Sequence, residues 1–153
     1  MDSPLASFSI NVIEDASNRL LLLRRSKKLK WGAGLWGFSA GHIEPGESPD
    51  DCSLRELREE LGSDLRVEQL TRFGPVRDTL YGGRYEIYLF HYRYLGGAIR
   101  LNHEHTGSAW ITREQFKDYN VMDGIDEDIL YLDIWPRIYL REEKLPKAES
   151  SYE

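Results

Sequence analysis

The stretch that decides the fold spans residues 41–63 and reads GHIEPGESPDDCSLRELREELGS. Between positions 44 and 60 it holds seven acidic and two basic residues, a balance of −5, whereas the whole chain of 153 residues carries only −6. Because like charges repel one another in so short a segment, this concentration needs an explanation.

The local signals predict one helix, at residues 49–61. Ser48 is the expected N-cap, Pro49 suits the first helical position, and Asp51 completes a start that resembles a capping box. Gly62 is expected to end the helix in a left-handed conformation.

At 100° per residue, one side of this helix carries three glutamates: Glu56, Glu59 and Glu60. The nearly opposite side carries leucines that are expected to face the core: Leu54, Leu57 and Leu61. Two interpretations stay open at this point. The glutamates form a solvated face, which is the usual case for charged runs, or they bind a hard cation such as Mg²⁺, which prefers carboxylate oxygens.

The rest of the chain predicts strands before and after this helix, and therefore a mixed sheet flanked by helices. The expected strands and extended pieces are 8–14, 19–24, 36–38, 41–43, 65–73, 84–94 and 108–111, the first two forming a hairpin. Further helices are expected at 112–119, opened by a capping box, and at 124–135. Pro136 is expected to kink the second of these helices or to start a new one.

Composition limits the class of protein. The length suits a single domain, expected over residues 1–143, followed by a polar and disordered tail over 144–153. A pI near 5.3 argues against general nucleic-acid binding, and no apolar run approaches the ~18 residues that cross a membrane. The N-terminus lacks the pattern of a secretory signal, and the single cysteine makes a cytoplasmic location the expectation.

The spacing within residues 41–63 resembles the Nudix box, G-x5-E-x7-R-E-U-x-E-E-x-G-U, where U is aliphatic. The fixed positions that match are Gly41, Glu47, Arg55, Glu56, Glu59, Glu60 and Gly62, with Leu57 at the first aliphatic position. Seven fixed matches arise by chance with a probability on the order of 10⁻⁸ per frame. Two departures are Ser63, where the box has an aliphatic residue, and Ser39-Ala40, where family members often carry Pro-Gly.

This resemblance implies an α/β/α sandwich with a central mixed β-sheet. It also implies a hydrolase that cleaves the diphosphate bond of a nucleoside diphosphate linked to another moiety, by means of water activated by Mg²⁺ or Mn²⁺. The implied metal ligands are Glu56, Glu59, Glu60, the backbone carbonyl of Gly41, and Glu47 directly or through water. Catalytic roles fall on Glu59 and Glu60, with Arg55 holding a glutamate in position.

Outside the box, Glu104 is a candidate catalytic carboxylate, because some Nudix enzymes place a base or metal ligand in a loop ahead of a strand tryptophan. The alternative is an exposed loop carboxylate. The flanking His103 and His105 could contact phosphate, although a surface histidine more often has no such role. Candidate substrate-binding residues are Arg24, Arg25, Trp36, Tyr81 and Tyr85, each with a structural alternative, a salt bridge or core packing. Cys52 is interpreted as a packing residue, and the acidic run at 123–128 as a helix start.

Two further classes stay open. A Nudix domain that binds nucleotide without turnover would regulate a partner, and a plain interaction domain would show no response to divalent ions. The substrate is expected to be a small nucleotide, chosen by loops 26–35, 75–83 and 102–107. The aromatic segment 79–94 would form either a wall for the base or the surface of a homodimer.

Overall fold

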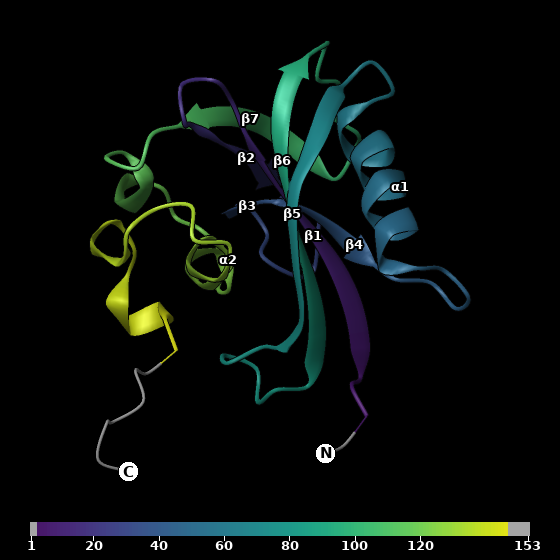
Figure 1. Cartoon of the computed structure of the whole chain (residues 1–153), viewed down its shortest axis with the longest axis vertical. Helices are drawn as coiled ribbons and strands as arrows, with labels where there is room; N and C mark the ends of the chain where they lie inside the picture. Colours follow the sequence, from purple (N-terminus) through teal and green to yellow (C-terminus); the bar gives the residue numbers. More distant parts are fainter. Residues whose placement is uncertain (1–2, 147–153) are drawn as a thin grey trace.

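The computed structural model describes residues 3–146, in which a seven-stranded sheet separates two helices (Figure 1). The strands are β1 (Ala6–Glu14), β2 (Leu20–Arg25), β3 (Trp36–Gly37), β4 (Ser39–His42), β5 (Arg66–Arg77), β6 (Tyr85–Gly96) and β7 (His105–Ile111). The helices are α1 (Pro49–Leu61) and α2 (Ile125–Tyr131), with 3₁₀ turns at Phe116–Asp118, Arg137–Tyr139 and Glu142–Lys144.

The sheet is mixed, as predicted. Its strand order is β3-β2-β1-β6-β5, while β4 pairs with β1 and β7 pairs with β2. β1 and β6 run parallel from Ala6↔Tyr85 to Glu14↔Arg93, and the other pairs are antiparallel. The expected hairpin of the first two strands is present, with Glu14 opposite Leu20.

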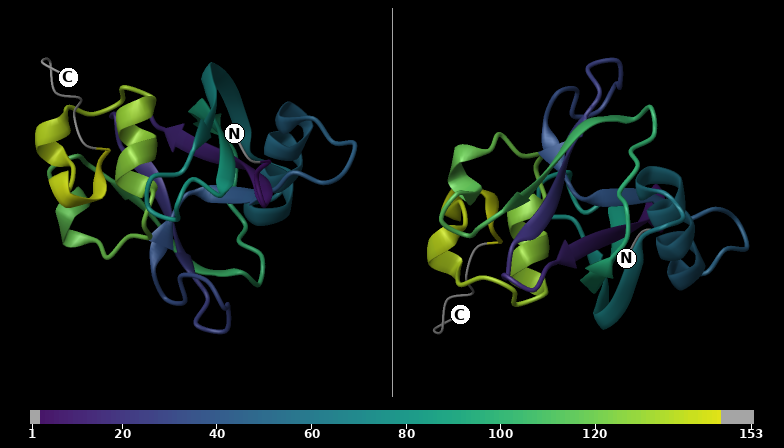
Figure 2. Two further views of the ribbon diagram at one scale, coloured as in Figure 1. Left: turned by 90° about the horizontal axis from the view of Figure 1, so that it is seen from below. Right: turned by 90° about the horizontal axis from the view of Figure 1, so that it is seen from above.

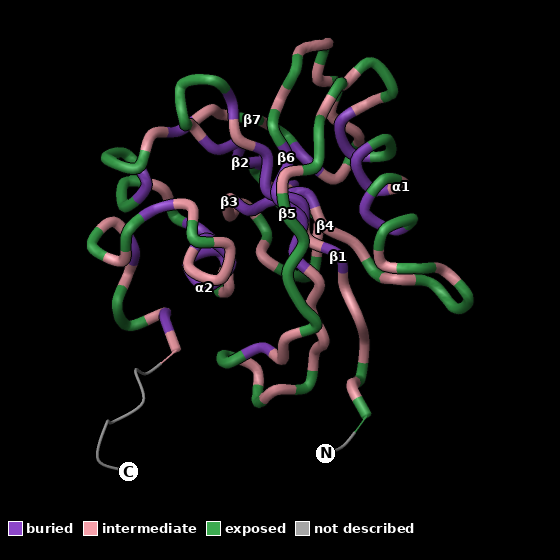
Figure 3. Tube along the Cα trace, in the orientation of Figure 1, coloured by how far each residue is buried: buried purple, intermediate pink, exposed green. Residues whose placement is uncertain are grey.

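Alternating residues of the central strands feed two separate cores, one on each face of the sheet. Val12, Leu20 and Leu22 pack on the α2 side, whereas their neighbours Ile13, Leu21 and Leu23 pack on the α1 side. Figure 2 shows α1 and α2 on opposite sides of the strands, and Figure 3 shows that the buried residues concentrate along the centre of the sheet. This arrangement confirms the predicted α/β/α sandwich.

Helix α1 begins and ends where the sequence predicts. The hydroxyl of Ser48 accepts a hydrogen bond from the backbone N–H of Asp51 at 3.0 Å. Gly62 has a φ of +93° and donates its N–H to the carbonyl of Arg58, so the glycine lets the chain leave the helix in a conformation that other residues adopt only with strain.

The core face of α1 differs from the expectation. Leu57 and Leu61 are buried, but Leu54 is 46% exposed, and the buried positions are completed by Cys52, Ser53, Glu56 and Glu60. The prediction for Leu54 is wrong because the helix turns Glu56 and Glu60, and not this leucine, toward the sheet.

The C-terminal third also needs correction. The helix expected at 112–119 is only a 3₁₀ turn, although Gln115 does accept from the N–H of Thr112. The helix expected at 124–135 is α2, which ends earlier and is followed by Asp133 at a φ of +54°. Leu145 is buried in the core on the α2 side, so any polar tail begins later than residue 144; residues 147–153 lie outside the described part of the chain.

Candidate active site

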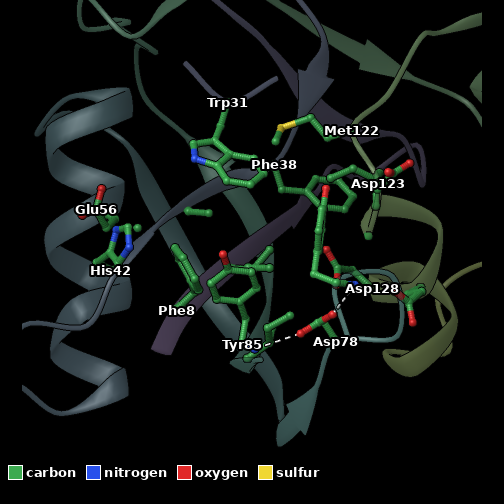
Figure 4. A pocket seen from close by; sticks show the side chains of 18 of the residues that line it. Phe8, Trp31, Phe38, His42, Glu56, Asp78, Tyr85, Met122, Asp123 and Asp128 are labelled. Atoms are coloured by element: carbon green, nitrogen blue, oxygen red, sulfur yellow. Dashed lines mark hydrogen bonds between the residues drawn. The ribbon is translucent and has the colours of Figure 1, made fainter. Parts of the chain in front are cut away.

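A cavity of about 480 Å³ lies between the β4–α1 segment and α2 (Figure 4). Gly41, His42, Arg55 and Glu56 line one side of it, and residues of α2 and of the loop before it line the other. Strand residues between these sides include Phe8, Ile10, Phe38, Tyr85 and Ile87. Segments distant in the sequence, from residue 8 to residue 131, therefore contribute to one cavity.

Arg55 connects the loop before α1 to the acidic side of the helix. Its Nε and Nη2 donate to both carboxylate oxygens of Glu47, at 2.7 and 2.9 Å. Its Nη1 donates to Glu56 at 2.8 Å and lies 3.3 Å from Glu59, and Nη2 also reaches the carbonyl of His42 at 3.0 Å. The bond from Arg55 is the main reason that the pKa of Glu47 falls to about 2, so Glu47 stays ionised and holds the guanidinium in place.

Glu60 is almost completely buried behind this group. One of its oxygens accepts from the hydroxyl of Ser39 at 2.8 Å and from the N–H of Ala40 at 2.9 Å. Burial is the largest cause of the rise in its pKa to about 8, and burial also raises the pKa of Glu56, against the opposing effect of Arg55. The two residues that depart from the usual Pro-Gly, Ser39 and Ala40, are thus the donors that orient Glu60.

Gly41 has no room for a side chain. A Cβ built on this residue would lie 2.0 Å from the carboxyl carbon of Glu56 and 2.1 Å from one of its oxygens. A side chain at this position would therefore displace the carboxyl group of Glu56, and glycine lets the backbone of β4 lie against that group in its present position.

The donor set on this side fits a hard divalent ion. Carboxylates of Glu56, Glu59 and Glu60 and the carbonyl of Gly41 are the oxygen ligands that Mg²⁺ and Mn²⁺ prefer, and the close approach at Gly41 brings that backbone against Glu56. Within residues 3–146, no three His, Cys, Asp or Glu side chains already converge in a geometry that would hold an ion; Arg55 lies among the carboxylates instead. A bound ion would therefore have to draw these carboxylates away from Arg55.

Glu104, the catalytic candidate outside the box, lines the same cavity as Glu56. Its charge is among the smaller causes that raise the pKa of both Glu56 and Glu60. The neighbouring His105 is buried, with Nε2 3.7 Å from Glu60, and burial lowers its pKa to about 4. His105 is therefore a neutral packing partner of Glu60 near neutral pH, whereas His103 is exposed.

Three of the five predicted substrate-binding residues line the cavity: Arg25, Tyr81 and Tyr85. The structure places the other two elsewhere. Trp36 packs edge to face on Tyr119, with ring centres 5.2 Å apart, and Arg24 is exposed and donates to the carbonyl of Gly34.

Tyr81 and Tyr85, which the sequence predicted, belong to a row of aromatic rings that borders the cavity, and the other members of this row were missed. Neighbouring ring centres lie 4.3–5.9 Å apart in the order Trp31, Tyr81, Tyr85, Phe8 and His42. The members come from four separate segments, so no local spacing could have revealed the row. It begins at the exposed Trp31 and ends beside Gly41.

A buried polar network supports the site from the α1 side of the sheet. Asn11 donates to the hydroxyl of Ser39 and to the carbonyl of Ser53, whose own hydroxyl bonds Asn11 and Tyr92. Because Ser39 in turn bonds Glu60, this network holds the buried glutamate through partners that are themselves fixed.

Comparison with known proteins agrees with this geometry. Residues 4–130 match the family model described as NUDIX domain, so the chain belongs to the Nudix family and is a Nudix hydrolase. No helix among residues 3–146 has both the length and the apolar character needed to cross a membrane.

Individual relatives and similar solved structures carry different names. The nucleoside triphosphatase NudI of Escherichia coli O17:K52:H18 is 30% identical over 97 residues, which are 58% of this chain and 69% of the relative. The MutT protein of Methanosarcina mazei Go1 has a TM-score of 0.63 and 22% identity, and the match covers 88% of this chain and 92% of that one. An ADP-ribose pyrophosphatase of Streptococcus suis 89-1591 has a TM-score of 0.63 and 20% identity, over 84% of this chain and 87% of that one. The two solved structures, each less than 25% identical to this chain, show that the fold is shared.

Proposed function

We propose that this Nudix hydrolase is a Mg²⁺- or Mn²⁺-dependent pyrophosphohydrolase. Its substrate is a nucleoside diphosphate linked to another moiety, as in a nucleoside triphosphate or a nucleotide sugar. The observation that carries the proposal is the group of box carboxylates beside Gly41, at one side of a cavity large enough for a small ligand. Similarity to a nucleoside triphosphatase supports the nucleotide part of the proposal.

The residues divide the work by charge and position. The ion would be held by the Gly41 carbonyl and by the carboxylates of Glu56, Glu59 and Glu60. Glu47 fixes the guanidinium of Arg55, and Arg55 in turn orients or releases a glutamate. When bound, a divalent ion neutralises the phosphates and lowers the pKa of a coordinated water. We propose that Glu104, which lines the same cavity, accepts a proton from the attacking water, and that Arg25, another lining residue, contributes positive charge.

The test is a panel of nucleoside triphosphates, nucleotide sugars, ADP-ribose, dinucleotides and capped RNA, with Mg²⁺ or Mn²⁺ and with products identified. The double variant Glu56→Gln plus Glu60→Gln is expected to lose activity on whichever compound the wild type hydrolyses. Its matched control is Glu68→Gln plus Glu114→Gln, which neutralises two exposed carboxylates. The function is excluded if the wild type hydrolyses nothing or if the double variant remains fully active.

A divalent ion should also raise the melting temperature of the wild type, because a ligand that binds only the folded state stabilises it. A rise with no turnover of any compound would favour the non-catalytic, regulatory class. We also propose a cytoplasmic location, which the single cysteine supports. The proposal further includes a homodimer, for which the exposed edge strand β5 offers a surface.

A further inference from the structure

The C-terminal segment, residues 132–146, lies beside α2 on the side away from α1 (Figures 1 and 2). It follows the family match, which ends at residue 130, and its Trp135, Leu140 and Leu145 are buried in the core on the α2 side of the sheet. None of residues 132–146 lines the cavity, whereas residues between 122 and 131 form one of its walls. The segment therefore lies behind this wall without being part of it.

Arg141 joins the C-terminal segment to α2 and to the 3₁₀ turn that precedes α2. Its backbone N–H and its Nη1 donate to the two carboxylate oxygens of Asp126, at 2.7 and 3.5 Å. Its Nη2 donates to the carbonyls of Phe116, Lys117 and Tyr119, at 3.3, 3.2 and 2.5 Å. Because a guanidinium is planar and presents several donors in fixed directions, this one side chain fixes α2 relative to the turn.

Helix α2 depends on such support from outside. It has only seven residues, and its N-cap, Gly124, makes no side-chain cap bond, so the helix would be marginal by itself. Its first turn also carries Asp126, which is completely buried and forms an ion pair with Arg141. A buried carboxylate that loses its partner is strongly destabilising. Without the Arg141 side chain, the first turn of α2 is therefore expected to move toward solvent.

The expected movement is local, because the loop before α2 has its own attachment to the sheet. The N–H of Met122 donates to the carbonyl of Trp36, in β3, at 2.9 Å. Ile125 and Glu127 lie beyond this attachment, line the cavity and are direct neighbours of Asp126 in the helix. A displacement at Asp126 would therefore change the shape of the cavity and leave the sheet in place.

We propose that Arg141 is a positioning residue for the nucleotide substrate. It holds α2 where this wall fits the substrate, although Arg141 itself does not line the cavity. The inference rests on the proposed function, since it concerns the fit of the substrate in the same cavity. The expected effect is on binding and not on the chemical step, because Gly41 and Glu56 lie on the opposite wall.

The experiment uses Arg141→Met, which keeps most of the apolar stem and removes the guanidinium donors. Hydrolysis of ATP, GTP, CTP and UTP is measured with Mg²⁺, and binding of the same nucleotides is measured by calorimetry. A variant in which about one molecule in ten has the wall in place binds about 10-fold more weakly. We therefore expect KM and Kd to rise about 10-fold, kcat to stay nearly unchanged, and amide exchange in residues 122–131 to become faster.

The matched control is Arg137→Met, which removes another arginine of the C-terminal segment. Arg137 pairs with Glu142 at 2.8 Å, within the same segment, so its loss should leave KM, Kd and the exchange of residues 122–131 at their wild-type values. A second variant, Arg141→Lys, keeps a positive charge beside Asp126 but lacks the planar group of donors. Its KM should lie between those of the wild type and Arg141→Met.

The outcomes separate a positioning role from a structural one. A lower melting temperature in Arg141→Met with wild-type KM and Kd, or an equal rise of KM in Arg137→Met, overturns the inference and leaves the proposed function standing. Where only Arg141→Lys folds, its KM decides: a rise supports the inference and a wild-type value overturns it. Nucleotide binding that weakens in Arg141→Met, without hydrolysis by the wild type, supports the inference and overturns the proposed function. No nucleotide binding by the wild type overturns both.

Discussion

At the scale of single residues, Gly41 offers a sharp test of the site because its constraint is steric. In Gly41→Ala the new Cβ meets the carboxyl group of Glu56, which must move away, so we expect kcat/KM to fall by roughly 100-fold. The matched control is Gly107→Ala, whose Cβ would meet nothing nearer than 3.8 Å. Steady-state kinetics of both variants check this, and full activity in Gly41→Ala would show that Glu56 has another acceptable position.

Glu60 should make the stability of the metal-free protein depend on pH. Its pKa of about 8 in the folded state lies above the ordinary value of 4.5, so its contribution is complete below pH 4.5 and is lost as the pH rises through 8. His105, with a pKa of about 4, acts in the opposite direction, mainly below pH 6.5 where its unfolded form is largely protonated.

The window from pH 6.5 to 8 therefore includes the loss of the protonated Glu60, together with contributions of the same sign from Glu56, Glu127 and Asp128, whose pKa values are also raised. With chelator present, the free energy of unfolding should fall by about 1–2 kcal/mol across this window. In Glu60→Gln the fall should be smaller, as measured by urea denaturation at the two pH values. Equal slopes in wild type and variant would contradict the prediction.

Residues of the Nudix box could be predicted from the sequence because their roles depend on fixed spacing along one helix and its preceding loop. Glu47, Arg55 and Glu59 meet as the spacing indicates. Ser39 could not be assigned, since its partner Glu60 lies 21 residues away in the sequence. Such contacts have no period that a pattern could reveal.

At the scale of elements, two leucines of α1 show that the helical pattern of the sequence does not by itself determine which side chains are buried. Leu57 is 4% exposed and Leu54 is 46% exposed, although the sequence pattern places both on the core face. Leu57→Ala should lower the free energy of unfolding by about 2–4 kcal/mol, and Leu54→Ala by less than ~1 kcal/mol. Chemical denaturation of the two variants checks this, and similar losses in both would mean that the helix is turned differently in solution.

The bounds of α1 were predictable because caps at Ser48 and Gly62 are local signals. The strands were less so. β5 continues to Arg77, beyond the expected end at residue 73, because pairing with β6 extends it through irregular positions near Pro75. α2 is shorter than expected, since packing on the sheet and the left-handed Asp133 decide its end.

At the scale of the whole molecule, a side-chain hydrogen bond connects the β5–β6 loop to α2. It runs from the hydroxyl of Thr79 to the buried carboxylate of Glu127. Thr79→Val removes this donor, so we expect a loss of about 1–2 kcal/mol in stability and faster amide exchange in residues 78–84. KM for the nucleotide substrate should rise more than kcat falls, because the loop carries Tyr81.

Hydrogen-exchange mass spectrometry and kinetics measure these effects, with Thr71→Val, at an exposed position of β5, as the control. Unchanged exchange in the loop would mean that other contacts hold it to α2.

The class of fold followed from the order of strands and helices, but the pairing that builds the sheet did not. β1 and β6 lie parallel although Ala6 and Tyr85 are far apart in the sequence, and only the closed structure brings them together. The same pairing carries Phe8 and Tyr85 to the cavity, which explains why the aromatic row was not predictable.

The two walls of the cavity come from different stretches of the chain, residues 41–56 on one side and residues 122–131 on the other. A change inherited in one stretch therefore leaves the other intact. Descendants of one ancestral hydrolase could keep the catalytic helix unaltered while point changes around α2 redirected them to new compounds. Related hydrolases would then differ in residues of the wall around α2, whereas they would share the residues of the catalytic wall.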